Sequence, residues 1–190
     1  MGSMCDDMTD EPDDQSQPPM NATEVKNFFE STATEWDTMR LTYYDERVIE
    51  TMADAIALDG TQTVLDVGTG TGFVAAGLAP LAGRVVALDH SPAMLAVARE
   101  NLTKLGIQNV ELREGNLTHV PFADDSFDAA VANMVLHHAE DPPQMIAEMA
   151  RVVRPGGWVA ITDEVEHHYE WMRTEQADIW LGFAPEQVEG

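Results

Sequence analysis

The spacing of apolar residues divides the chain into parts with different properties. Residues 1–20 consist mainly of Asp, Glu, Pro, Gln and Ser without periodic apolar positions, so this stretch cannot bury enough surface to offset the entropy of ordering. We interpret it as a disordered acidic tail that opens on what resembles a cloning remnant. Residues 21–58 carry apolar side chains at helical spacing, for example Val48, Met52 and Ile56. This pattern predicts at least two helices before the first strand.

Residues 59–190 alternate short apolar runs with amphipathic stretches. Five runs are predicted to be strands: Thr63–Val67, Arg84–Asp89, Asn109–Arg113, Phe127–Asn133 and Gly157–Asp163. Ser91 and Pro92 mark the start of a helix that should stop at Gly106, and Asp141-Pro142 opens another. Strands that alternate with helices over short connections predict an α/β fold with a doubly wound, mostly parallel sheet.

The charge balance excludes several classes of function. The chain has 34 acidic against 10 basic residues and a formal net charge of -24. Such a surface repels phosphate backbones and anionic headgroups, so the chain is not expected to bind nucleic acid or a membrane surface. A lysine-poor, acid-rich surface suits a protein that stays hydrated in high salt, although a high-GC genome gives the same bias.

The cysteine content and the hydropathy pattern bear on location. Cys5 is the single cysteine of the chain, so an internal disulfide or a cysteine metal centre is ruled out. No run of about 18 apolar residues occurs, and the acidic N-terminus lacks the features of a signal peptide. These observations predict a cytoplasmic protein without a membrane anchor.

The glycine-rich segment Val64–Gly72 follows the first predicted strand directly. Glycines at this place let the backbone turn sharply and approach a nucleotide-type ligand. Residues 70–75 also fit the G-x-G-x-x-A pattern of dinucleotide-binding proteins, so a nicotinamide dehydrogenase is a second interpretation. A third is a tight turn without a ligand. Asp89 ends the second strand about 20 residues later, where a carboxylate can accept hydrogen bonds from both ribose hydroxyls. It could instead cap a helix, but Ser91 already fills that role.

Further motifs extend this pattern along the chain. They are Glu114-Gly115-Asn116, Pro121-Phe122, Asp125-Ser126-Phe127-Asp128 and Arg154-Pro155-Gly156-Gly157. In order and spacing, the set resembles the motifs of class I S-adenosylmethionine-dependent methyltransferases, above all the ubiquinone/menaquinone biosynthesis methyltransferase-like branch. The resemblance covers about Phe28 to Phe183. It implies a Rossmann-like domain at residues 59–190, a lid formed by the N-terminal helices, S-adenosylmethionine as cofactor and a small-molecule methyl acceptor.

The resemblance also implies which residues hold the cofactor. Its methionine part should be faced by Asp66, Gly68, Gly70, Thr71 and Gly72. Asp89 should bind its ribose and Met94 should cover one face of its adenine. Asn116 and the Leu117 backbone should contact the adenine edge, and Asn133 should lie beside the amino acid group or the sulfonium. Many relatives have Asp where this chain has Asn116. Nicotinamide binding gives no reason for the Ser126-Phe127-Asp128 segment, so that alternative is set aside.

Methyl transfer requires few catalytic side chains, because alignment in a dry pocket supplies most of the effect. His137 and His138 follow the fourth strand and are candidates to take a proton from the nucleophile; alternatively they only shape the pocket. The polar residues from Glu164 to His168 could bind a metal, but we favour an ordinary helix start there and predict no metal site. The aromatic residues Trp36, Tyr43 and Tyr44 fit a lid and simple helix packing equally well.

The C-terminal part departs from the family pattern. Relatives add a helix and an antiparallel pair of strands after the fifth strand, whereas only 27 residues remain from Glu164 onward. We predict a helix over Trp171–Leu181, the start of another at Phe183–Gln187, and no antiparallel strands. The fifth strand would then be an open edge, available for a homodimer through that edge or through the C-terminal region.

Two hypotheses follow. The first is a methyltransferase for a small or lipophilic molecule, such as a quinol-like ring. The second is a cofactor-binding domain without turnover, or a truncated remnant, that acts through a partner. Arsenite is a poor substrate candidate, because arsenite methyltransferases use several cysteines and the predicted folded part contains none.

Overall fold

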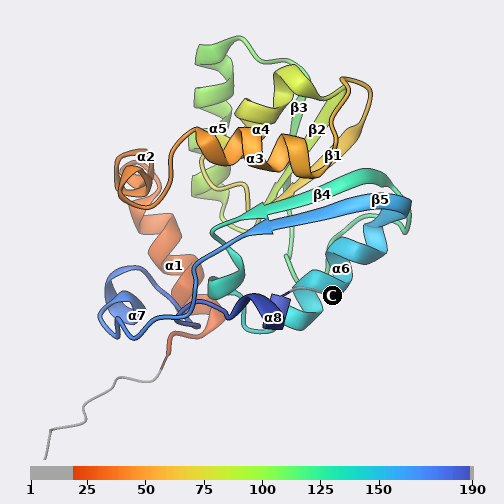
Figure 1. Cartoon of the computed structure of the whole chain (residues 1–190). Coiled ribbons are helices and arrows are strands. Elements are labelled where there is room, and N and C mark those ends of the chain that lie inside the picture. The colour runs from red at the N-terminus through yellow and green to blue at the C-terminus, as the bar shows by residue number, and fades with distance from the viewer. Residues whose placement is uncertain (1–18, 189–190) are drawn as a thin grey trace, which may run out of the picture.

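The fold is a five-stranded sheet with helices on both faces, as Figure 1 shows. The computed structural model describes residues 19–188, so the predicted tail lies almost wholly outside the described residues. All neighbouring strands are parallel, in the order β3-β2-β1-β4-β5. This confirms the predicted α/β Rossmann-like class.

The strands agree with their apolar runs to within a few residues. They are β1 (Thr63–Val67), β2 (Arg84–Asp89), β3 (Val110–Glu114), β4 (Phe127–Asn133) and β5 (Val153–Thr162). β5 begins earlier than predicted, because Val153 pairs with Phe127 before the register shifts. Within this irregularity Gly156 has φ +81, and a Cβ on Gly157 would clash with the Asp128 carbonyl oxygen. The motif at residues 154–157 thus forms a bulge inside the strand.

The structure has eight α-helices among the described residues. They are α1 (Ala22–Thr32), α2 (Trp36–Met39), α3 (Arg47–Ala55), α4 (Phe73–Leu78), α5 (Pro92–Leu105), α6 (Pro142–Val152), α7 (Met172–Glu175) and α8 (Pro185–Val188), with 3-10 turns at Arg40–Thr42, Ala79–Leu81 and Leu136–His138. Ser91 caps α5, whose last turn closes on Gly106 at φ +70, and Asp141 caps α6. Both predicted helices therefore begin where their capping residues indicate, and α5 also ends at its predicted glycine.

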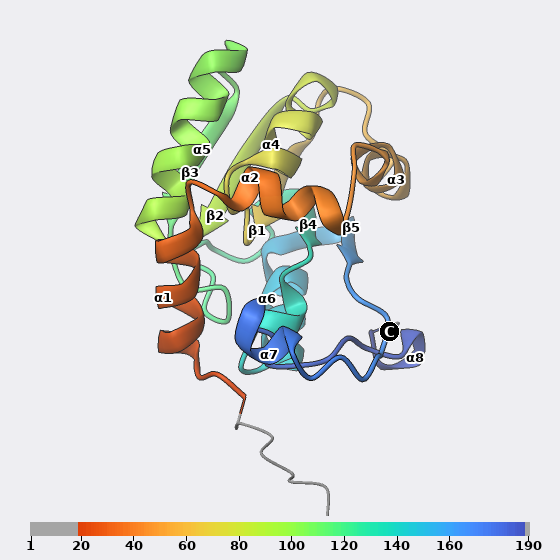
Figure 2. The same ribbon diagram turned by 90° about the vertical axis from the view of Figure 1, so that its left-hand side faces the viewer.

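Two apolar clusters fill the space between the layers. One packs α3 and α4 against one face of the sheet, with Met52, Leu78 and Val131 fully buried. The other packs α6 against the opposite face through Met145 and Met149. α1 and α2 lie apart from both layers, beside the carboxyl ends of the strands (Figure 2). Because parallel strands bury both faces, this arrangement leaves the carboxyl edge as the place for a ligand.

The predicted helix over Trp171–Leu181 is wrong. Only Met172–Glu175 is helical, because Ala177 adopts a left-handed φ of +66 that ends any helix. The chain then turns inward, and the N–H groups of Ile179 and Trp180 both donate to the His137 carbonyl oxygen at 3.0 Å. Contacts with a distant turn thus override the local helical pattern.

The segment after β5 is likewise not a helix start. Among residues 19–188 no strand follows β5, and Val165 forms only an isolated bridge to Phe183. The predicted lack of antiparallel strands is confirmed, and β5 is an edge strand with Trp158 and Val159 exposed. None of the described helices is both long and apolar enough to span a bilayer.

Candidate active site

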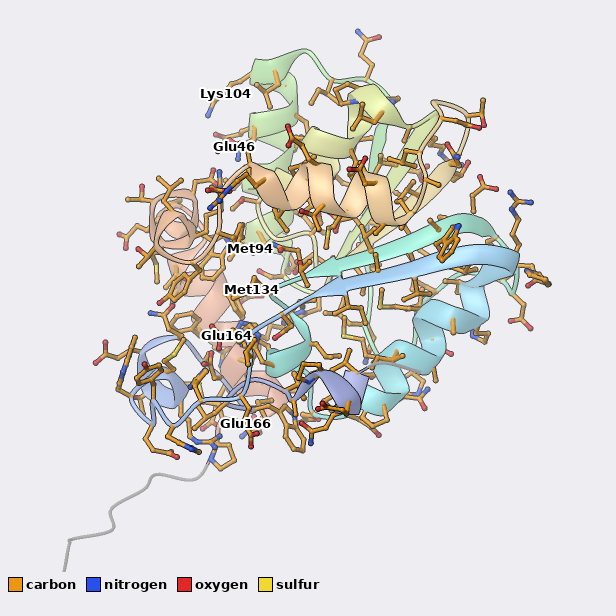
Figure 3. All side chains as sticks on the ribbon, viewed as in Figure 1. Glu46, Met94, Lys104, Met134, Glu164 and Glu166 are labelled. Carbon is orange, nitrogen blue, oxygen red and sulfur yellow. The ribbon has the colours of Figure 1, made fainter. Side chains whose placement is uncertain are left out.

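A pocket of about 740 Å³ lies at the carboxyl ends of β1, β2 and β4. α1 contributes Val25 and Phe29 to its wall and α2 contributes Trp36. In Figure 3 Met94 and Met134 lie at this edge of the sheet. The volume is within the usual range of about 300–1,000 Å³ for small-molecule sites.

Most of the predicted cofactor residues meet at this pocket. Its lining includes Asp66, Gly68, Gly70, Thr71, Asp89, Met94, Asn116, Leu117, Asn133 and His138. Two of the predicted site residues, Gly72 and His137, are not among the lining residues. Residues outside the predicted set, such as Phe29 and Glu114, also line it.

The glycine loop turns tightly between β1 and α4. Gly68 and Gly70 have φ values of +72 and +54, which favour glycine strongly. Gly72 begins α4 at φ +83, and a Cβ there would lie 3.2 Å from the Cβ of Ala98 on α5. Gly72 therefore lets α4 and α5 approach each other, which is a packing role that the motif alone does not distinguish from cofactor contact.

Asp89 fixes the loop against the end of β2. Its Oδ2 accepts the N–H of Gly70 and its Oδ1 accepts the N–H of Ser91, each at 2.8 Å. Burial raises the pKa of Asp89. The two hydrogen bonds and the neighbouring His90 oppose this shift. An ionised carboxylate has about four acceptor positions, so each oxygen keeps one for a ligand hydroxyl.

Asp66 lies beside Asp89 at the end of β1. It is almost fully buried, and its Oδ2 accepts the Thr69 hydroxyl at 2.6 Å. Burial raises the pKa of Asp66 to about 7. The charge of the carboxylate is therefore costly near neutral pH unless a cation approaches it.

The two asparagines already use their side-chain oxygens within the protein. Asn116 Oδ1 accepts both the N–H and the hydroxyl of Thr118, at 2.7 and 2.8 Å. Asn133 Oδ1 accepts the Thr162 hydroxyl at 2.7 Å. The Nδ2 group of each asparagine remains available as a donor. Asn116 is therefore better placed to donate to a ring nitrogen on the adenine edge than to accept from the exocyclic amine.

The N-terminal helices are fastened across the pocket. Asp37 on α2 accepts the Thr71 hydroxyl at 2.6 Å and the Asn101 amide at 2.8 Å, so it ties α2 to the glycine loop and to α5. Arg40 stacks 3.7 Å from the centre of the Phe73 ring. Trp36 and Tyr44 line the pocket, whereas Tyr43 lines a smaller cavity beside it. Sequence patterns could not reveal Asp37, whose partners lie 34 and 64 residues away.

Replacing Asp37 with alanine should loosen the attachment of α2 to the glycine loop and to α5. The change removes the two hydrogen bonds to this charged acceptor, each contributing about 1.5–3 kcal/mol, and also the contact with Arg40 Nε at 3.5 Å. We expect faster hydrogen exchange over residues 22–42 and about tenfold faster release of a pocket ligand. Asp45→Ala is the matched control, because Asp45 contacts the exposed Arg47. Equal hydrogen-exchange rates in the two variants would show that Asp37 does not hold α2 in place.

The two predicted catalytic histidines have different surroundings. His138 lines the pocket, and its Nδ1 lies 3.1 Å from the Ala177 carbonyl oxygen, so Nδ1 carries the proton and Nε2 the lone pair. Burial lowers the pKa of His138 well below its ordinary value, which keeps the ring neutral. His137 is turned away, with Nδ1 at 2.6 Å from Asp163 Oδ1. Burial lowers the pKa of His137, but this hydrogen bond and the surrounding carboxylates raise it overall.

Comparison with known proteins identifies the family. The methyltransferase domain family matches residues 65–161, and the chain belongs to it. An arsenite methyltransferase from Halobacterium salinarum is 41% identical over 55% of this chain and 28% of its own length. A ubiquinone/menaquinone biosynthesis C-methyltransferase from Haemophilus ducreyi is 32% identical over 73% of this chain and 56% of its own length. The chain thus spans about a quarter to somewhat more than half of these relatives.

A solved structure adds the cofactor. A protein from Aquifex aeolicus described as a SAM-dependent methyltransferase is 26% identical, with a TM-score of 0.60 over 90% of this chain and 82% of that one. S-adenosylmethionine is accordingly the cofactor of this domain.

The charge of the described pocket fits this cofactor. Five acidic residues line the wall, and Lys26 is the one permanent cation among the lining residues. Such a wall favours a ligand that carries a sulfonium and an ammonium.

Cofactor affinity should depend on pH through Asp66. With a pKa of about 7 the carboxyl is mostly neutral at pH 6 and mostly ionised at pH 8, and only the ionised form attracts the cofactor's positive groups. We expect roughly tenfold tighter binding of S-adenosylmethionine at pH 8 than at pH 6. Calorimetry at both pH values measures this, with Asp66→Asn expected to flatten the slope. An unchanged slope in that variant would assign it to Asp89 instead.

Proposed function

We propose that this protein transfers the methyl group of S-adenosylmethionine to a small or lipophilic acceptor, quinol-like or similar. The observation that carries the proposal is the pocket itself. It is lined by the buried carboxylates Asp66 and Asp89 and also by the aromatic residues Phe29, Trp36 and Tyr44. The carboxylates suit a cationic cofactor, and the aromatic residues suit an apolar, ring-shaped acceptor.

The chain's residues would divide the work as follows. When bound, S-adenosylmethionine supplies an electrophilic methyl group on its sulfonium. Asp89 would hold the ribose, the glycine loop with Asp66 would hold the methionine part, and α1 and α2 would exclude water from the site. His138 is the residue we assign to accept a proton from an acceptor hydroxyl, since its Nε2 carries the lone pair. Its low pKa makes it a weak base, so orientation in the pocket contributes most of the rate.

The names of the relatives restrict the acceptor only loosely. One relative is named a quinone biosynthesis C-methyltransferase and another an arsenite methyltransferase. Cys5 is the single cysteine and lies outside the described residues. Thiolates are the ligands expected for a soft metalloid, so we favour the quinol-like class over arsenite.

A second candidate function is cofactor binding without turnover, in which the chain acts through a partner. The observation that favours it is the open edge at β5, where Trp158 is 55% exposed. A second copy of the chain or another protein could cover this edge.

A binding and turnover experiment separates the two candidates. Calorimetry with S-adenosylmethionine comes first, followed by transfer of a labelled methyl group to quinols, phenols and thiols. Binding with transfer supports the first candidate, and binding without transfer to any acceptor supports the second. His138→Gln should slow transfer while it leaves cofactor affinity within about threefold of the wild type, and His168→Gln, on the exposed surface, is its control. Absence of cofactor binding would overturn both.

A further inference from the structure

A second, much smaller cavity lies beside the pocket, between the turn after β4 and the C-terminal segment. Its volume is about 10 Å³, and its lining includes Tyr43, His137, Glu164 and Asp178. A cavity of this size holds about one water molecule or one ion. The proposed methyl transfer uses none of these four side chains.

Asp178 is the least satisfied group in this cavity. Its side chain is fully buried, and neither carboxylate oxygen has a hydrogen-bond partner. The nearest ring nitrogens are His137 Nε2 at 3.7 Å and His138 Nδ1 at 3.9 Å, both beyond hydrogen-bond distance. Burial raises the pKa of Asp178 to about 7, so a cation next to it would favour the ionised carboxylate over the protonated form near neutral pH.

His137 is held in the orientation of a metal ligand. Its Nδ1 donates to Asp163 Oδ1 at 2.6 Å, which leaves Nε2 open on the side of Asp178. Asp163 is itself fixed by the backbone N–H groups of Leu136 and Glu164, each at 2.8 Å. A carboxylate behind a ligating histidine sets the ring orientation in this way at many metal sites.

The distances suit coordination better than hydrogen bonding. Two ligands of one tetrahedral ion, each about 2.1 Å from it, lie roughly 3.4 Å apart. The separation of 3.7 Å between His137 Nε2 and Asp178 Oδ1 is close to this value.

Glu164 and His167, from the loop after β5, form a second group around Asp178. The ligand atoms of these three residues all lie within 4.8 Å of one another, as do those of His137, His138 and Asp178. His167 Nε2 and Glu164 Oε2 are now hydrogen-bonded at 2.9 Å, a contact that two bonds to an ion would replace. His138 also borders Asp178, but its Nδ1 is engaged by the Ala177 carbonyl oxygen.

We propose that His137, Glu164, His167 and Asp178 bind one divalent transition-metal ion of the zinc class. Two imidazoles and two carboxylates match that class, whereas magnesium and calcium prefer oxygen ligands alone. The ion would join the turn after β4, the loop after β5 and the C-terminal segment. It would thereby fix Ala177, the hydrogen-bond partner of His138 in the pocket wall.

The test begins with the full chain treated with a chelator. Zinc, cobalt(II) and magnesium are then titrated separately by calorimetry in 1 M KCl, which screens binding to the acidic surface. We expect one zinc per chain, cobalt absorption bands typical of nitrogen and oxygen ligands, and magnesium at least a hundredfold weaker. Zinc should also raise the melting temperature. A zinc affinity no tighter than that of magnesium would overturn the proposal.

Matched variants separate the site from the surface. Glu164→Gln should weaken zinc binding at least tenfold, whereas Glu166→Gln, two residues away on the exposed surface, should not (Figure 3). Asp178→Asn keeps the side-chain shape and should remove the zinc-dependent rise in melting temperature. Cys5→Ser tests whether the single thiol contributes. Unchanged zinc affinity in both Glu164→Gln and Asp178→Asn, with folding verified by circular dichroism, would also refute the site.

Discussion

Replacing Asp89 with asparagine should weaken S-adenosylmethionine binding by at least a hundredfold. The carboxylate accepts one backbone N–H on each oxygen and keeps one further acceptor position on each for the ribose hydroxyls. Each hydrogen bond to a charged group contributes about 1.5–3 kcal/mol, so two together correspond to roughly 10²–10⁴ in affinity. Asparagine has one oxygen, and its NH₂ group cannot accept the N–H of Gly70 or a hydroxyl proton.

Three measurements test whether the lost affinity of Asp89→Asn comes from its contacts with the ribose. Calorimetry should show adenosine losing affinity by a factor similar to that of the whole cofactor, because the lost contacts are to the nucleoside. Glu100→Gln, an exposed acid on α5, has the same charge change and should bind like the wild type. Circular dichroism should show that the variant remains folded. If Asp89→Asn binds the cofactor within about threefold of the wild type, the ribose assignment is wrong.

Local signals along the sequence account for most of the fold. α5 begins at Pro92 and ends before Gly106 because a capping serine, a proline and a left-handed glycine specify both ends within the helix's own residues. Strands β1 and β2 were predictable for a similar reason, since buried parallel strands are mostly apolar. These elements depend little on which distant residues they meet.

The errors occur where distant contacts decide the conformation. Trp171–Leu181 has a helical pattern, but Ala177 takes a left-handed φ and places Asp178 in the interior. The inward turn is held by the His137 carbonyl oxygen, about 40 residues earlier in the chain. No periodicity within eleven residues can encode that contact.

The candidate site divides in the same way. The glycine loop, Asp89 and Met94 could be placed from motifs, because the ends of adjacent parallel strands must meet at one edge. By contrast, the motif could not separate Gly72, which serves helix packing, from Gly70, which lines the pocket. A glycine pattern specifies where a Cβ is excluded, but not whether a ligand or another helix excludes it.

Gly68→Ala should have the largest effect on stability. Gly68 has φ +72, and an added Cβ would meet the side chain of Val135 at less than van der Waals distance. Left-handed backbone costs roughly 1–2 kcal/mol for alanine, and overpacking costs about 1–3 kcal/mol more. We expect a destabilisation of about 2–5 kcal/mol, measured by urea unfolding. A loss below about 1 kcal/mol would show that the loop relaxes without difficulty.

Two further variants divide this loss between backbone and packing. Gly106 has a similar φ of +70 with no atom within 4 Å of an added Cβ, so Gly106→Ala should show the backbone cost alone. Val135→Ala removes the atoms that an alanine at position 68 would meet. In the double variant Gly68→Ala/Val135→Ala, the sum of the single effects should exceed the measured loss by about 1–3 kcal/mol, because the clash is relieved. Strictly additive effects would mean that Val135 is not what excludes a side chain from the loop.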